Sequence, residues 1–230
     1  MTIKTKRFMS IIICGILFLS MVTGCDKGYE SGQPVTEGEN KVEDVTTDVV
    51  VVGGGGSGLT AAINVKYGNK DVILVEKMPM LGGNTIFGST SLTANNSKIM
   101  QEQGTAVSDV EFFDWYMKKD PTCDPDAAKV IVEKSGEAID WLAGLGMDLT
   151  RVINTYGHSP ADGSAPGPHI IKALKDEAEK QGVDYRLNTR ATEIIMDGDK
   201  VAGVKVTGPD GEYNIYAKAV ILCAGGFAAN

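Results

Sequence analysis

Hydrophobic and polar positions divide the chain into segments with two kinds of periodicity. Residues 48–52 predict a strand, because Asp48 is followed by four consecutive valines, as expected for a parallel strand that is buried on both faces. Residues 125–145 instead repeat their apolar positions every three to four residues, which predicts an amphipathic helix. The same criteria predict further strands at 71–75, 185–187, 191–196, 201–206, 212–217 and 219–223, and further helices at 59–65, 109–120 and 169–181.

The order of these elements predicts an α/β fold. A strand, a helix and a second strand follow one another between 48 and 75, which is the start of a Rossmann-like parallel sheet. Turn residues at 197–200 and 208–211 join the later strands into an antiparallel β-meander. We expect 219–223 to return to the parallel sheet, so the meander is inserted into a Rossmann-like domain.

The N-terminus has the pattern of an export signal. Three basic residues precede the apolar stretch 8–22, which is shorter than the ~20 residues of a membrane span. The stretch ends in small residues before a cysteine, which resembles a bacterial lipobox and predicts a signal peptide at 1–24 and a lipid on Cys25. An uncleaved anchor with an incidental cysteine is the alternative. In both cases we expect an exported protein held at the extracytoplasmic face of the cell membrane.

Composition narrows the function classes. The formal net charge is −8, which argues against a nucleic-acid partner because phosphate binding needs a basic surface. The four cysteines include no CxxC pair, which excludes a disulfide scaffold, a zinc ribbon and c-type haem attachment. Residues 25–44 are acidic and poor in apolar side chains, as is typical of a flexible tether.

Glycines gather directly after the first strand. Gly53, Gly55 and Gly58 form a GxGxxG motif between the strand at 48–52 and the following helix. In this motif the first glycine permits a tight turn, the second lets a pyrophosphate approach the backbone, and the third lets the helix pack close to the strand. The N–H groups at the start of the helix then face the phosphates. The pattern predicts a dinucleotide site.

The segment after the second strand separates two possible dinucleotides. Glu76 ends that strand, at the spacing at which a carboxylate accepts hydrogen bonds from a ribose 2′-hydroxyl. These features fit both FAD and NAD. A double glycine at 82–83 and a Gly/Ser/Thr/Asn-rich stretch up to 96 favour FAD, because such a stretch can lie along an extended ligand. An ordinary strand–helix turn with a surface glutamate is the alternative.

Four segments carry a family resemblance over 45–230. They are, in chain order, DVVVVGGGGSGLTAA, VEKMPMLGGNTIFGS, DYRLNTRATEI and AKAVILCAGGF. Together they resemble the FAD-binding domain of the fumarate reductase/flavocytochrome c family. That family includes urocanate reductase and related 2-enoate reductases, and it is akin to the succinate dehydrogenase flavoprotein subunit.

The resemblance implies which residues bind FAD. The glycine turn (residues 53–58) would hold the pyrophosphate, and the end of the second strand would hold the adenosine ribose. The GGN segment (residues 82–89) would run along the flavin side. The last motif would lie against the dinucleotide at a strand end. Carried over in that order, the residues are Gly53, Gly55, Ser57 and Gly58, then Glu76 and Lys77, then Gly83, Asn84, Thr85, Gly88 and Ser89, and finally Ala224 and Gly225.

Histidines bear on how the cofactor is attached. Membrane-bound members of the family attach FAD through a histidine after the double glycine, but 82–97 contains none, so we expect non-covalent FAD. We expect His158 to make a structural hydrogen bond rather than to bind a substrate anion. We also expect the capping domain and the catalytic residues of the family to lie beyond Asn230. Residues 45–230 are therefore predicted to be the N-terminal portion of a longer FAD-binding domain, inactive alone.

The expected function follows from the resemblance. Reduced flavin would give a hydride to an unsaturated carboxylate such as fumarate or a related 2-enoate. The chain has no haem or iron–sulfur motif, so an external electron donor is expected. One alternative is a flavin dehydrogenase that oxidises succinate-like or ketosteroid substrates. Another is a lipoprotein that binds a nucleotide without catalysis.

Overall fold

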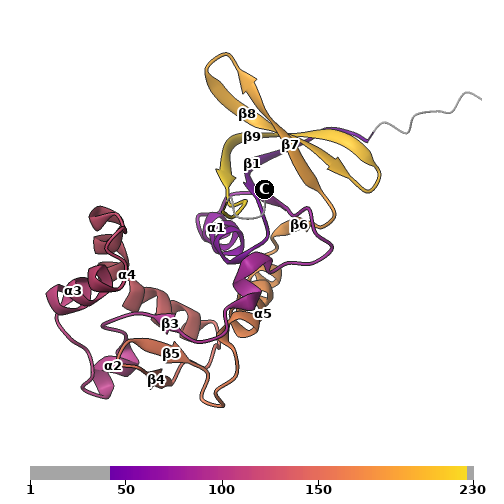
Figure 1. The fold of residues 1–230 in the computed structure, drawn as a ribbon. Coiled ribbons are helices and arrows are strands. Elements are labelled where there is room, and N and C mark those ends of the chain that lie inside the picture. Colours follow the sequence, from indigo (N-terminus) through magenta and orange to yellow (C-terminus); the bar gives the residue numbers. More distant parts are fainter. Residues whose placement is uncertain (1–41, 227–230) are drawn as a thin grey trace, which may run out of the picture. The chain divides into compact units, whose positions relative to one another are not determined.

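A computed structural model describes residues 42–226 (Figure 1). The predicted signal peptide, Cys25 and all but the last part of the predicted tether lie outside the described residues. The main sheet has six strands in the order β6-β2-β1-β9-β8-β7. These strands are β1 (Val45–Val52), β2 (Val72–Val75), β6 (Asp184–Arg186), β7 (Arg190–Asp197), β8 (Lys200–Gly208) and β9 (Gly211–Leu222).

A second, smaller sheet and six helical segments complete the described chain. The small sheet is antiparallel in the order β3-β5-β4. Its strands are β3 (Leu92–Thr93), β4 (Arg151–Ile153) and β5 (Gly157–Ser159). The helices are α1 (Gly56–Tyr67), the 3₁₀ helix η1 (Gly83–Phe87), α2 (Lys98–Glu102), α3 (Asp109–Lys119), α4 (Pro125–Gly144) and α5 (Pro166–Lys180).

The six-stranded sheet has a parallel half and an antiparallel half, as predicted. β1 lies between β2 and β9 and runs parallel to both, with Val50 opposite Ile73 on one side and Val220 on the other. β7, β8 and β9 form the antiparallel meander. The sequence predicted two strands at 212–217 and 219–223, but the structure has one continuous strand, β9. Its backbone pairs with β8 before it pairs with β1, so no turn is needed between the two halves.

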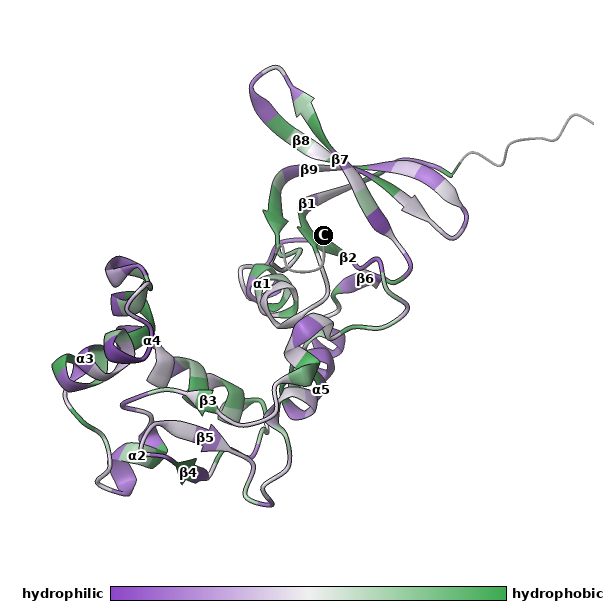
Figure 2. Ribbon diagram, in the orientation of Figure 1, coloured by the Kyte–Doolittle hydropathy of each residue, from purple (hydrophilic) through white to green (hydrophobic). Residues whose placement is uncertain are grey.

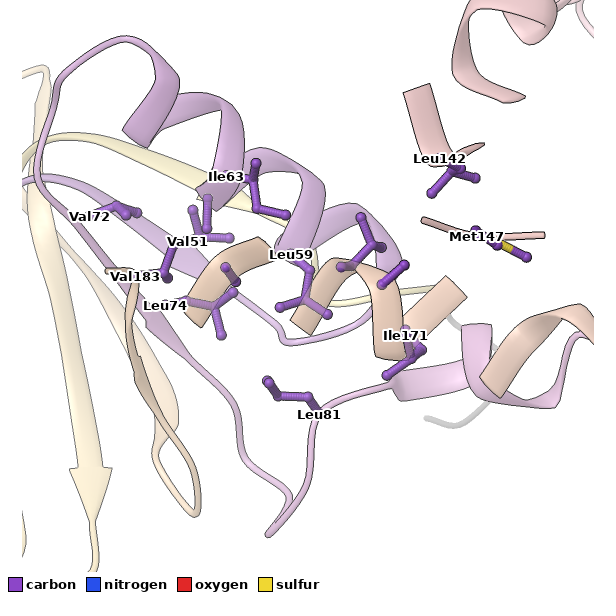
Figure 3. Close-up of a cluster of buried hydrophobic side chains, with 14 of the residues drawn as sticks. Val51, Leu59, Ile63, Val72, Leu74, Leu81, Leu142, Met147, Ile171 and Val183 are labelled. Atoms are coloured by element: carbon purple, nitrogen blue, oxygen red, sulfur yellow. The ribbon is translucent and has the colours of Figure 1, made fainter. Parts of the chain in front are cut away.

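The central strand buries side chains on both faces, which explains its uninterrupted hydrophobic run. Val51 belongs to a buried hydrophobic cluster that also contains Leu59 of α1, Leu74 of β2 and Ile171 of α5 (Figure 3). Val50, its neighbour in sequence, belongs to a second cluster with residues of the meander. Alternate residues of a strand point to opposite faces, so a strand covered on both sides needs an apolar residue at every position. Each large side chain buried in this way stabilises the fold by about 1.5–3 kcal/mol.

Two helices begin earlier than the hydrophobic pattern predicted. α1 begins at Gly56, so the second part of the glycine turn is already helical. α5 begins at Pro166 rather than at His169, because proline fixes the φ angle that the first helical position needs. α4 begins as predicted, with Asp124 accepting hydrogen bonds from the N–H groups of Asp126 and Ala127. Hydrophobic and hydrophilic residues are interleaved along α4 (Figure 2).

Candidate functional site

The glycine turn joins the end of β1 to the start of α1. Gly53 has φ +109°, and a Cβ there would lie 2.3 Å from the carbonyl oxygen of Cys223. A Cβ at Gly58 would lie 1.8 Å from the carbonyl oxygen of Gly53. Real Cβ atoms do not approach backbone so closely. These two glycines are therefore required by the packing of strand, turn and helix.

Gly55 is different, because the protein itself leaves room for a side chain there. A Cβ at Gly55 would have no neighbour closer than 3.7 Å, and its φ of −78° suits any residue. Gly55, the N-cap residue of α1, supplies no side-chain cap, and the first turn contains no acidic residue. No carbonyl of α1 can accept from the N–H groups of Ser57 and Gly58. An open backbone beside uncapped N–H donors fits a pyrophosphate, whose negative charge also suits the helix dipole.

Glu76 follows β2 and is buried, with 7% of its surface exposed. Its Oε2 accepts from the N–H of Gly54 at 2.6 Å, and its Oε1 accepts from the N–H of Met78 at 2.8 Å. An ionised carboxylate offers about four acceptor positions, so two remain for ribose hydroxyls. Lys77, the next predicted residue, is exposed at the same strand end.

The GGN segment packs directly against the glycine turn. The N–H of Gly82 donates to the carbonyl of Gly54 at 2.9 Å, and the N–H of Gly56 donates to Thr85 Oγ1 at 3.1 Å. Thr85 thus accepts from the start of α1 that Gly55 leaves uncapped. The segment is not fully extended, because residues 83–87 form η1. Asn84 and Ser89 are exposed on it.

The start of α5 also contacts the GGN segment. The N–H of Gly167, in the first turn of α5, donates to the carbonyl of Gly88 at 2.9 Å. A Cβ at Gly167 would lie 2.4 Å from the carbonyl oxygen of Thr85, so only glycine allows this approach. Neither Gly54 nor Gly167 is among the predicted FAD-binding residues. Gly54 is a variable position inside the GxGxxG motif and Gly167 lies outside all the predicted motifs, so only the packing shows their roles.

The last predicted motif reaches the same sheet edge. The N–H of Cys223 donates to the carbonyl of Val52 at 2.8 Å, which continues the pairing of β9 with β1. The N atom of Ala224 would lie 3.3 Å from a Cβ on Gly53. Gly225 has φ +86° and is exposed. The structure therefore gathers the glycine turn, Glu76, the GGN segment and the last motif where β1, β2 and β9 end.

The glycine- and proline-rich region 156–168 contains the short strand β5. His158 lies in β5 and is fully buried, and its Nε2 lies 2.8 Å from Ser97 Oγ. Burial lowers the pKa of this imidazole, outweighing the carbonyls of Leu92 and Tyr156 and the charge of Asp140, which act in the opposite direction. The expected structural hydrogen bond is present.

Within residues 42–226, no helix is long and apolar enough to cross a membrane. The same residues contain no group of three or more histidine, cysteine, aspartate or glutamate side chains placed to hold a metal ion.

Comparison with known proteins assigns the fold to a family. The family described as "FAD binding domain" matches residues 48–230, and this chain belongs to it. FAD is therefore its cofactor, and the open glycine turn and the buried Glu76 fit that cofactor.

Reductases are prominent among the similar proteins. The chain is 37% identical over 202 residues to NADH:fumarate oxidoreductase of Klebsiella pneumoniae (strain 342), covering 84% of this chain and 22% of that protein. It is 38% identical over 195 residues to the fumarate reductase (cytochrome) of Shewanella frigidimarina, covering 80% and 34%. It is 35% identical over 201 residues to urocanate reductase of Eggerthella lenta, covering 82% and 33%.

A solved structure agrees with these relatives. The open conformation of a flavocytochrome c3 fumarate reductase superposes with a TM-score of 0.76 at 33% identity, covering 81% of this chain and 35% of that chain. The match confirms the predicted Rossmann-like fold with its inserted meander. The chain thus spans about a third or less of the length of these relatives.

Proposed function

We propose that this chain is the FAD-binding part of a reductase that acts on unsaturated carboxylates. The observation that carries the proposal is the meeting of the glycine turn, Glu76 and the GGN segment through Gly54 and Thr85. The similar proteins named for fumarate and urocanate support the substrate class. Bound FAD would supply hydride transfer from its reduced ring.

The chain's own residues would bind and orient the cofactor. Uncapped N–H groups around Gly55 and Ser57 would hold the pyrophosphate, and Glu76 with Lys77 would hold the adenosine ribose. Along the flavin side, the exposed groups of the GGN segment would supply hydrogen bonds, and Ala224 with Gly225 would close the strand end. The segment 82–97 contains no histidine, and His158 is bonded to Ser97, so we propose non-covalent binding.

Export and anchoring remain part of the proposal. The signal at 1–24, the lipid on Cys25 and the spacer 25–44 would hold the domain at the extracytoplasmic face of the membrane, where an external donor would reduce the flavin. Mass spectrometry of the N-terminal peptide from membranes tests this. A diacylglyceryl adduct on Cys25 that disappears in Cys25→Ala is expected, whereas an unmodified peptide that begins at Met1 would contradict it.

The enzymatic proposal is tested in two stages. Purified chain is titrated with FAD, and saturable quenching of flavin fluorescence at one site per chain is expected. The full-length protein is then tested in two forms. The form reduced with dithionite is mixed with fumarate or urocanate, and the oxidised form is mixed with succinate or a 3-ketosteroid. Rapid reoxidation by an unsaturated carboxylate supports the reductase. Reduction of the oxidised flavin by succinate or the steroid would favour the dehydrogenase instead. If neither reaction occurs, the result would favour a protein that binds the nucleotide without catalysis.

A further inference from the structure

One apolar side chain beside Glu76 is left half-exposed by the fold. Met78 is 51% exposed, although its backbone is fixed from both sides. Its N–H donates to Glu76 Oε1 at 2.8 Å, and its carbonyl accepts from the N–H of Asn188 at 3.1 Å. The thioether therefore extends from an anchored position into solvent.

Glu76 itself is held by the same neighbouring segment. Its N–H donates to the carbonyl of Arg186 at 2.9 Å, and its carbonyl accepts from the N–H of Thr189 at 2.8 Å. These bonds extend the pairing of β2 with β6 beyond the ends of both strands. The carboxylate and the start of Met78 thus form one rigid unit.

We propose that Met78 contacts the adenine ring of FAD and contributes to its affinity. This inference rests on the proposed binding of the adenosine ribose by Glu76. Adenine is bonded directly to that ribose, so it would lie near the segment that surrounds the carboxylate. The backbone N–H of Met78 is hydrogen-bonded to Glu76, which places the start of the Met78 side chain in that segment. A thioether is flexible and polarisable, and it makes favourable contacts with aromatic rings. Covering the purine would also remove the half-exposed side chain from water.

Met80 is the matched control, because it is the same residue type in the same loop. It is 56% exposed, and no hydrogen bond joins it to Glu76 in the described chain. Both side chains lie on the surface, so neither substitution by alanine removes core packing. We expect Met78→Ala to raise the Kd for FAD and for ADP about three- to tenfold, and Met80→Ala to change either by less than about twofold.

Peroxide footprinting provides a readout that does not depend on variants. Dilute hydrogen peroxide converts an exposed thioether to its sulfoxide and is itself reduced to water. With saturating ADP, we expect Met78 to oxidise several-fold more slowly and Met80 at an unchanged rate, as measured by peptide mass spectrometry. Equal oxidation of Met78 with and without ADP, together with an unchanged Kd in Met78→Ala, would overturn the assignment while leaving FAD binding intact. Absence of any saturable FAD binding by the unmodified chain would overturn both proposals.

Discussion

Ser97 Oγ lies 2.8 Å from His158 Nε2 and also accepts a hydrogen bond from the N–H of Met100 at 3.3 Å. A hydroxyl oxygen has two lone pairs, so Ser97 Oγ can accept from the backbone and still bond the imidazole in either ring tautomer. The other ring nitrogen, Nδ1, is buried and has no hydrogen-bond partner among the described residues. The contact ties the start of α2 to β5.

Acidification is expected to weaken the fold through His158. Its pKa is lowered by burial, so the unfolded chain binds a proton at a higher pH than the folded chain does. The contribution to stability is complete above the unfolded value of about 6.5 and is lost as the pH falls through the lower folded value. Urea midpoints between pH 7.5 and 5 should show this decline, and an NMR titration of the His158 ring should give a pKa below about 6.5.

The acidic side chains allow this effect to be separated from ordinary acid denaturation. Hydrogen bonds lower the pKa values of Asp148 and Asp162, whose contributions are lost only below the usual carboxyl range of about 4. A midpoint that stays constant from pH 7.5 to 5, with an NMR pKa at or above about 6.5, would contradict the role given to burial.

Glu76→Gln is expected to weaken FAD binding without unfolding the chain. The amide keeps the size of the side chain but loses the charge and one acceptor, and hydrogen bonds to charged groups are worth about 1.5–3 kcal/mol. We expect the Kd for FAD to rise about tenfold or more. Fluorescence quenching measures it.

Glu177→Gln provides a control of matched burial. Glu177 is also 7% exposed, but its carboxylate accepts from Tyr67, Lys180 and Gln181 rather than from the glycine turn. This variant should lose stability and keep its affinity for FAD. An equal loss of affinity in both variants would show that Glu76 acts only through the fold.

Gly58→Ala is expected to disrupt the strand–turn–helix joint. The added methyl would lie 1.8 Å from the carbonyl oxygen of Gly53, and backbone must move to relieve it. We expect a loss of at least about 3 kcal/mol, or roughly 6–12 °C in Tm. Gly144→Ala, at the end of α4, meets no atom within 4 Å and should be neutral or stabilising. Calorimetry of the two variants compares a crowded glycine with an open one.

Thr85→Val tests whether the GGN segment caps α1. Valine keeps the shape of threonine but leaves the N–H of Gly56 without its acceptor, which is expected to cost about 1 kcal/mol before any cofactor is added. Thr85→Ser keeps the hydroxyl and should lie close to the unmodified chain in urea unfolding. Identical midpoints for the valine and serine variants would mean that the bond to Gly56 contributes nothing.

Sequence patterns predicted the features that depend on local chemistry. The uninterrupted run in β1, the glycine turn and the proline-started α4 each follow from the residues themselves, so their positions were correct within a few residues. The three short strands of the small sheet were not predicted, although the equally short β6 was. β3 and β5 carry little hydrophobic pattern of their own and are defined by their pairing with each other.

The meeting of the motifs also could not be derived from their spacing alone. Glu76 and Gly54 are brought together by the register between β1 and β2, in which Val52 lies opposite Val75. That β9 is one strand could not be predicted either, because its continuity depends on pairing with both β8 and β1. These are long-range relationships, and a single sequence contains no local signal for them.

The continuity of β9 has a consequence for local unfolding of the sheet. One backbone completes the hydrogen-bond ladder of the meander and then that of the nucleotide-binding half, and it passes from β8 to β1 without a hinge. Freeing the meander therefore withdraws the end of a strand that also borders β1. Amide hydrogen exchange should therefore report β1, β8 and β9 as a single cooperative unit. Opening of the meander and opening of the cofactor-binding end of the sheet would then occur in the same unfolding event.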